Sequence, residues 1–211
     1  MPKNSDSSKN TEELLDFIVE ELLKKGIKAT TMDSLASDLQ MSKRTLYEIF
    51  LSKENMVERA LKNFHNRLMA EHRHIYDSSS NMMEAMVCFL QNTRNWMARA
   101  NVNFFRDIDE YYNAQEKKKD DRECRYAELE KLFLRGAEEG YFRKDVNFKV
   151  QCRLITIQME SLKRMEEYFP HDITLLEAYD EISKGFLRSI ASQKGLEYLD
   201  NRNLDFNKKT K

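Results

Sequence analysis

The stretch Thr30–Lys53, TTMDSLASDLQMSKRTLYEIFLSK, predicts two short helices joined by a tight turn. Thr30 followed by Asp33 predicts a capping box at the start of the first helix, and Ser42 predicts the N-cap of the second. The apolar residues recur at helical spacing and predict a buried wedge of Leu35, Ala36, Leu39, Met41, Leu46, Ile49 and Phe50. This pattern is typical of a helix-turn-helix.

The second helix of the stretch leaves polar and cationic side chains outside the wedge. Hydroxyl and cationic groups of this kind bind phosphates and base edges in a DNA major groove. We expect Lys43, Arg44 and Thr45 to reach base edges, and Thr31, Tyr47 and Lys53 to bind phosphate. The predicted DNA-binding residues are Lys28, Thr31, Ser42, Lys43, Arg44, Thr45, Tyr47 and Lys53.

Several positions also resemble the N-terminal domain of TetR-type transcriptional regulators. They are Thr-Thr before the first helix, Leu-Ala within it, and Ser-Lys-x-Thr-Leu-Tyr-x-x-Phe followed by Ser-Lys-Glu. An upstream helix fits too, since Gly26 ends an apolar stripe made of Leu14, Leu15, Ile18, Val19, Leu22 and Leu23. The resemblance covers roughly residues 11–60. It departs from the family at Gln40, where Gly is usual, and at Glu48, where a polar or basic residue is common.

Composition restricts the class of protein. Of 211 residues, 34% are charged and 41% hydrophobic, and only five Gly and two Pro occur, which favours long helices. No apolar run is long enough to span a membrane, so we expect a cytoplasmic protein without a membrane partner. Three widely separated cysteines are read as free thiols, not as a disulfide or zinc site.

The formal net charge of −1 excludes a non-specific nucleic-acid binder, which needs a strongly basic balance. A sequence-specific regulator needs only a local basic face. Such a face is predicted around the motif from Lys24, Lys25, Lys28, Lys43, Arg44 and Lys53.

The helical period continues beyond the motif and predicts an all-α fold of about nine helices. Three form an N-terminal helix-turn-helix domain, and the others form a larger helical ligand-binding and dimerisation bundle. The predicted parts are a flexible arm over 1–10, the DNA-binding domain over 11–52, an effector and dimerisation domain over 53–194 and a flexible tail over 195–211. The later helices are predicted over 53–76, 82–100, 102–112, 116–140, 147–168 and 173–192.

The resemblance implies a homodimer that uses the last two long helices, 147–168 and 173–192, and binds double-stranded operator DNA. Gly185 in the last of these helices would permit close helix approach, or would be a tolerated weak point. In the family, the middle helices surround a cavity for a small molecule. An apolar or aromatic effector is therefore expected near Met86, Phe89, Trp96, Phe104, Phe105, Tyr111, Tyr126 and Phe133. Taken singly, each of these residues is better explained as an ordinary core residue, and only the group indicates a pocket.

Two alternatives remain open. An architectural DNA-binding protein without an effector would need fewer aromatic residues in its bundle. A helical metalloenzyme is suggested only by Glu71 and His74, which have the Glu-x-x-His spacing of di-iron bundles but no second copy on another helix. No catalytic residue, metal site or cofactor is predicted. The sequence favours a transcriptional regulator, with repression as the family default.

Overall fold

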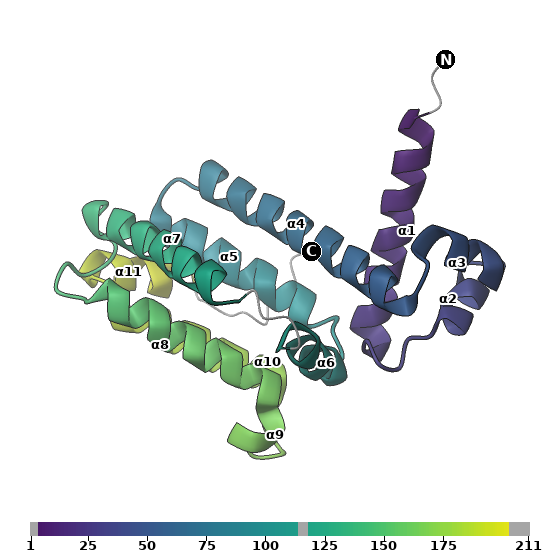
Figure 1. Ribbon diagram of the computed structural model, residues 1–211. Helices are drawn as coiled ribbons and strands as arrows, with labels where there is room; N and C mark the ends of the chain where they lie inside the picture. The colour runs from purple at the N-terminus through teal and green to yellow at the C-terminus, as the bar shows by residue number, and fades with distance from the viewer. Residues whose placement is uncertain (1–3, 114–117, 203–211) are drawn as a thin grey trace. The chain divides into compact units, whose positions relative to one another are not determined.

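The computed structural model describes residues 4–113 and 118–202, and the side chains of residues 11–108 and 123–202. Its described residues form helices and no strand, apart from an isolated bridge between Phe142 and Ala191. The predicted all-α class is confirmed (Figure 1). The helices are α1 (Asn4–Lys25), α2 (Met32–Asp38), α3 (Lys43–Phe50), α4 (Lys53–Ser78), α5 (Met82–Met97), α6 (Val102–Asn113), α7 (Lys118–Glu138), α8 (Phe148–Ser161), η1 (Leu162–Arg164), α9 (Met165–Tyr168), α10 (Leu175–Ile190) and α11 (Gln193–Asn201).

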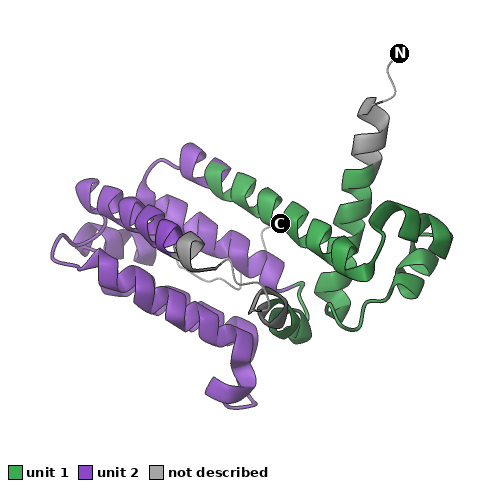
Figure 2. Cartoon of the chain, viewed as in Figure 1, with its two compact units in different colours: residues 1–73, 99–112 green, residues 74–98, 113–211 purple. Residues whose placement is uncertain are grey.

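The chain divides into two compact units (Figure 2). Unit 1 takes residues 1–73 and 99–112, and unit 2 takes residues 74–98 and 113–211. The predicted boundary lay between residues 52 and 53, whereas most of α4 and all of 99–112 belong with the helix-turn-helix. Contacts with α1 agree with this division, since Asn63 of α4 donates to Asp16 and the Asn101 N–H donates to the Leu23 carbonyl.

Unit 1 is organised around α1, whose apolar stripe is enclosed by its neighbours. Ile18, Leu22 and Leu23 are fully buried, and Gly26 ends the helix at φ +87 with its N–H donating to the Leu22 carbonyl. Gly26 thus acts as the predicted C-terminal cap. Asp16 on α1 accepts from Asn63 on α4 at 2.8 Å, which ties these two helices together.

The helix α6 joins unit 1 through the end of α1 and the loop after it. The Asn101 N–H donates to the Leu23 carbonyl at 2.7 Å, and the Lys28 N–H donates to Asp107 Oδ2 at 2.8 Å. Asp107 is 4% exposed, so this hydrogen bond is made inside the unit. Arg99 adds an exposed ion pair to Glu20.

Unit 2 has its core between α5, α7, α8 and α10. The Phe133 ring lies 5.4 to 6.0 Å from three others, those of Phe142, Phe148 and Phe186. Aromatic contacts at these distances favour edge-to-face and tilted packing. The core also holds an ion pair, in which Arg94 of α5 donates to Asp180 of α10 at 2.8 Å.

The C-terminal end differs from the prediction. Residues 193–201 form α11, although a flexible tail was expected from residue 195. Ser192 caps the helix, Leu199 is 1% exposed, and Arg202 pairs with Glu84 at 2.6 Å. Gly195 allows the helix to pack closely, since a Cβ there would clash with the Tyr141 carbonyl oxygen. These partners are distant in the sequence, so the local pattern does not reveal them.

The helix predicted over 147–168 is interrupted. It divides into α8, η1 and α9, and the buried Leu162 lies where the helix tightens. Over the described residues, none of the helices combines the length and the apolar character needed to cross a membrane.

Candidate nucleic-acid interface

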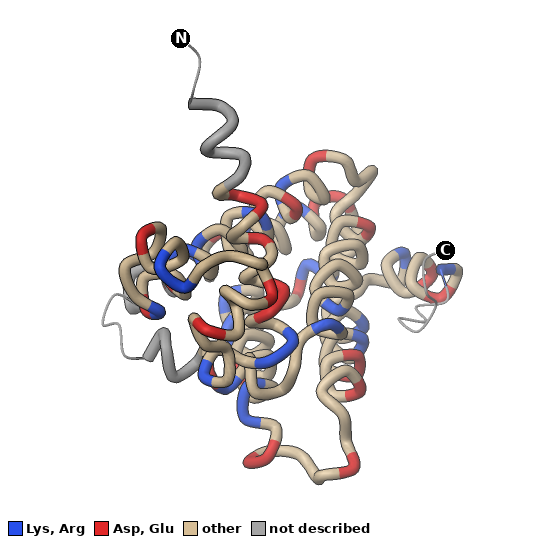
Figure 3. Tube along the Cα trace, turned by 90° about the vertical axis from the view of Figure 1, so that its right-hand side faces the viewer, with Lys and Arg blue, Asp and Glu red and all other residues tan. Residues whose placement is uncertain are grey.

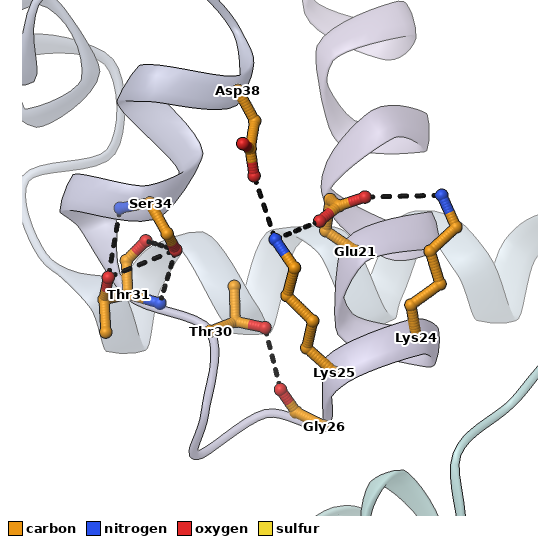
Figure 4. A network of polar contacts seen from close by, with 8 residues as sticks. All are labelled: Glu21, Lys24, Lys25, Gly26, Thr30, Thr31, Ser34 and Asp38. Carbon is orange, nitrogen blue, oxygen red and sulfur yellow. Dashed lines mark hydrogen bonds and ion pairs between the residues drawn. The ribbon is translucent and has the colours of Figure 1, made fainter.

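The first helix of the motif is capped one residue later than the sequence pattern suggests. Thr31 is the N-cap of α2: its hydroxyl accepts from the Ser34 N–H at 3.1 Å, and the Ser34 hydroxyl accepts from the Thr31 N–H at 3.2 Å (Figure 4). The predicted Thr30 and Asp33 box is therefore wrong. Thr30 is fully buried and instead donates its hydroxyl to the Gly26 carbonyl at 2.8 Å, which closes the loop after α1.

The turn between α2 and α3 contains one residue in the left-handed conformation. Gln40 adopts φ +53, and the Met41 N–H donates to the Ala36 carbonyl at 2.9 Å. A non-glycine residue in this conformation costs about 1 kcal/mol. Ser42 then caps α3 by accepting from the Thr45 N–H at 3.0 Å, as predicted.

The apolar wedge holds α2 and α3 against the rest of unit 1. Leu35, Leu46 and Phe50 are fully buried and Ala36 is 5% exposed, so these wedge predictions are confirmed. The remaining members, Leu39, Met41 and Ile49, are half-buried.

Arg59 of α4 fixes the end of α3. Its guanidinium donates to the Ile49 carbonyl at 2.9 Å and lies 4.8 Å from the centre of the Phe50 ring. A cation over an aromatic face adds attraction beyond apolar burial. Sequence reasoning did not identify Arg59, because an arginine on the following helix shows no local sign of this contact. Arg59 therefore helps to set the direction of α3.

The outer face of α3 holds the predicted contact residues, and most of them have a partner in the protein. Lys43 Nζ lies 2.6 Å from Asp33 Oδ1, and this hydrogen bond raises the pKa of Lys43. The hydroxyls of Ser42 and Thr45 lie 2.8 Å apart. Arg44 pairs with Glu48 at 2.9 Å, and the Tyr47 ring is 40% exposed. The structure therefore gathers these predicted residues on one exposed surface of unit 1.

Two of the lysines that flank α2 and α3 contact backbone carbonyls or carboxylates of unit 1. Lys53 Nζ donates to the Lys28 carbonyl at 3.1 Å, which brings both of these predicted residues to one place beside the motif. Lys25 bridges Glu21 and Asp38 at 2.5 and 2.9 Å (Figure 4). This hydrogen bond from Lys25 lowers the pKa of Glu21. Carboxylates thus offset part of the predicted basic face, and acidic and basic residues are interspersed over the described chain (Figure 3).

The predicted effector residues are distributed over both units. Met86, Phe89, Trp96, Tyr126 and Phe133 lie in unit 2, Phe104 and Phe105 in unit 1, and the side chain of Tyr111 is outside the described residues. Phe133 belongs to the aromatic core, Phe89 stacks on Tyr76 at 6.3 Å, and Tyr126 lies under Arg153 at 4.8 Å. A pocket formed by these residues stays a prediction.

The Glu-x-x-His pair lies on α4. Glu71 and His74 are both exposed, and the described side chains contain no group of three or more His, Cys, Asp or Glu arranged to hold a metal ion. His72 between them is half-buried, and burial lowers its pKa.

Comparison with known proteins gives a family and several relatives. Residues 14–60 match the family described as bacterial regulatory proteins, tetR family. The HTH-type transcriptional repressor KstR2 of Mycobacterium tuberculosis is 29% identical over 149 residues, which cover 68% of this chain and 74% of KstR2. An uncharacterized HTH-type transcriptional regulator of Bacillus subtilis, YvaF, is 31% identical over 83 residues, which cover 39% of this chain and 44% of YvaF.

Solved structures share the fold. The ketosteroid transcriptional regulator KstR2 of Mycobacterium tuberculosis superimposes with a TM-score of 0.58 at 23% identity, over 91% of this chain and 98% of that one. A putative transcriptional regulator from Saccharomonospora viridis, solved in complex with choline, gives a TM-score of 0.64 at 15% identity, over 88% and 100%. The likeness spans both the helix-turn-helix and the larger bundle.

Proposed function

The chain belongs to the tetR family of bacterial regulatory proteins, and from this premise we propose that it is a ligand-responsive transcriptional repressor. It binds a palindromic operator as a homodimer and releases it when a small apolar or aromatic effector binds. The observation that carries the proposal is the exposed face of α3, where Lys43, Arg44 and Tyr47 lie. The helix itself is capped by Ser42 and is anchored by its buried apolar face. A protein acting on the bacterial chromosome works in the cytoplasm.

The contacts with DNA divide into two kinds. Arg44 reaches base edges, because it lies in the first turn of the recognition helix. Lys53, at the start of α4, binds phosphate, and a phosphate contact does not distinguish one base pair from another. Arg44→Ala should therefore relax base preference at a defined position, whereas Lys53→Ala should weaken all duplexes alike and reduce the salt dependence. Fluorescence anisotropy with duplexes selected from a random library, at several salt concentrations, measures both. Unchanged affinity and base preference in Arg44→Ala would refute the assignment.

The homodimer is supported by an apolar stripe on α8. Val150, Leu154 and Ile157 are 47%, 47% and 60% exposed and recur at helical spacing. Gly185 on the neighbouring α10 is exposed, and a Cβ there would meet nothing within 4 Å. In a four-helix bundle of two α8 and α10 pairs, the stripe would be buried and Gly185 would let backbones approach closely. Two-fold symmetry then implies a palindromic operator.

Analytical ultracentrifugation of the whole chain tests this interface. Leu154→Glu should shift micromolar protein from dimer to monomer, since a carboxylate would be buried without a partner. Leu134→Glu is the matched control, because Leu134 is 48% exposed on α7, outside the proposed interface. Gly185→Leu should also give monomers while the monomer keeps its helical content by circular dichroism. A monomeric wild-type protein would refute the dimer.

The effector is the least defined part of the proposal. The relative KstR2 is named a ketosteroid regulator, so a ketosteroid is the first probe to try, and choline, bound by the Saccharomonospora viridis protein, is the second. Aromatic residues in unit 2 favour an apolar or aromatic ligand, and choline tests whether they bind a cation instead. Trp96 is the only tryptophan, so its fluorescence reports binding directly.

Induction requires that ligand and operator bind antagonistically. A coupling of about 1–3 kcal/mol would weaken operator binding several-fold or more, and operator must weaken ligand binding by the same factor. A ligand that quenches Trp96 equally with and without operator would not be an inducer. If no ligand of either class changed fluorescence or thermal stability, while specific DNA binding persisted, the alternative of a DNA-binding protein without an effector would be favoured.

A further inference from the structure

An exposed ion pair lies one helical turn apart on the face of α3 that is proposed to enter the DNA. The Arg44 Nε–H donates to Glu48 Oε1 at 2.9 Å, and the two side chains are 88% and 61% exposed. DNA carries a dense line of phosphates, so a carboxylate brought to it is repelled. Glu48 therefore weakens DNA binding unless it meets a hydrogen-bond donor within the groove.

The neighbouring side chains have other partners within the motif. Lys43 is paired with Asp33, and the Thr45 hydroxyl contacts that of Ser42. The contact between Arg44 and Glu48 uses Nε of the arginine and one oxygen of the carboxylate. The terminal amino groups of Arg44 can still donate, and the second oxygen of Glu48 can still accept.

The major groove offers a matching partner for each of these groups. Guanine presents the acceptors O6 and N7, which arginine contacts bidentately, and cytosine presents the N4 amino group, a donor that glutamate accepts from. The paired Arg44 Nε and Glu48 Oε1 atoms are 2.9 Å apart. This distance is close to one base-pair step of about 3.4 Å, so the two groups can face neighbouring base pairs.

We propose that Arg44 and Glu48 read two nearby base pairs as one unit, with Arg44 on a guanine and Glu48 on a cytosine. The inference rests on the proposed function, in which α3 lies in the major groove. The ion pair holds the guanidinium in place before DNA arrives. Glu48 also excludes guanine and thymine, because each would present an acceptor oxygen to its carboxylate. Each operator half-site then contains a guanine and a cytosine within two base pairs of each other.

Selection of duplexes from a random library by the whole chain, followed by sequencing, tests the proposal. The wild-type protein should enrich the guanine and the cytosine. Glu48→Gln should replace the cytosine with adenine, because glutamine binds adenine N6 and N7. Glu48→Ala should lose roughly tenfold discrimination at that pair, and Arg44→Ala should lose it at the guanine. Circular dichroism confirms that each variant is folded.

The matched control is Asp38→Asn. It also removes one negative charge from the motif, but Asp38 pairs with Lys25 and not with a residue of α3. This control should alter affinity for all duplexes equally and leave the selected bases unchanged. If Glu48→Gln behaved in the same way, the proposed reading would be overturned, while DNA binding by α3 would stand. If the wild-type chain enriched no sequence, the proposed function itself would fail.

Discussion

The helix-turn-helix of unit 1 and the core of unit 2 are each stabilised internally, by interactions that span different distances along the sequence. In the helix-turn-helix, the capping pairs Thr31 with Ser34 and Ser42 with Thr45 span three residues each. In unit 2, Arg94 and Asp180 are 86 residues apart, and the Tyr179 hydroxyl donates to a carbonyl 89 residues away. Local interactions leave a pattern in the sequence, whereas distant ones leave none. The helix-turn-helix can therefore be predicted in detail from the sequence, and unit 2 only in outline.

The largest effect is expected from the wedge of the helix-turn-helix. Phe50 is fully buried beneath the Arg59 guanidinium, so Phe50→Ala should lower the free energy of unfolding of unit 1 by about 4 kcal/mol through lost burial and a residual cavity. Urea unfolding followed by circular dichroism measures the loss. The adjacent Leu51 is 77% exposed, and Leu51→Ala should change stability by no more than about 0.5 kcal/mol. Equal effects would show that the local pattern does not mark the anchoring residues.

The second prediction concerns a long-range contact of unit 2. Asp180 and Arg94 have side chains 9% and 15% exposed, so Asp180→Asn leaves a charge enclosed and should cost about 3 kcal/mol. The control is the exposed pair of Arg153 and Glu123, where Glu123→Gln should cost less than about 1 kcal/mol. Thermal unfolding compares them. Similar losses in both variants would mean that burial does not distinguish these pairs.

The third prediction tests the docking of α11, which the sequence pattern did not reveal. A Cβ at position 195 would meet the Tyr141 carbonyl and the methyl group of Met83, so Gly195→Ala should destabilise unit 2 by about 2 kcal/mol through overpacking. Gln193→Ala on the same helix changes an exposed side chain and should have little effect. Denaturant unfolding gives both values. A neutral Gly195→Ala would indicate that α11 is loosely attached.

The limits of prediction follow the same division. The wedge, the Ser42 cap and the helical class could be predicted, because periodicity and capping act within one or two helical turns. The packing of α6 against unit 1 could not be predicted. It depends on Asp107, which accepts a hydrogen bond from the Lys28 N–H 79 residues earlier in the chain. The contact of Arg59 with Phe50 was missed for the same reason, at shorter range. Even the local pattern gave the N-cap of α2 one residue too early, at Thr30 instead of Thr31.

That cap gives the smallest effect and the sharpest local test. Thr31 and Ser34 each accept from the other's backbone N–H, so Thr31→Ala should cost about 1 kcal/mol of unfolding free energy. Because the two hydroxyls form one reciprocal unit, combining Thr31→Ala with Ser34→Ala should cost less than the sum, by about 0.5 kcal/mol. Combining Thr31→Ala with Asp33→Ala should be additive, since the Asp33 carboxylate pairs with Lys43 across the turn. Additivity of Thr31→Ala and Ser34→Ala would contradict the reciprocal cap, and double-mutant cycles in urea measure the coupling.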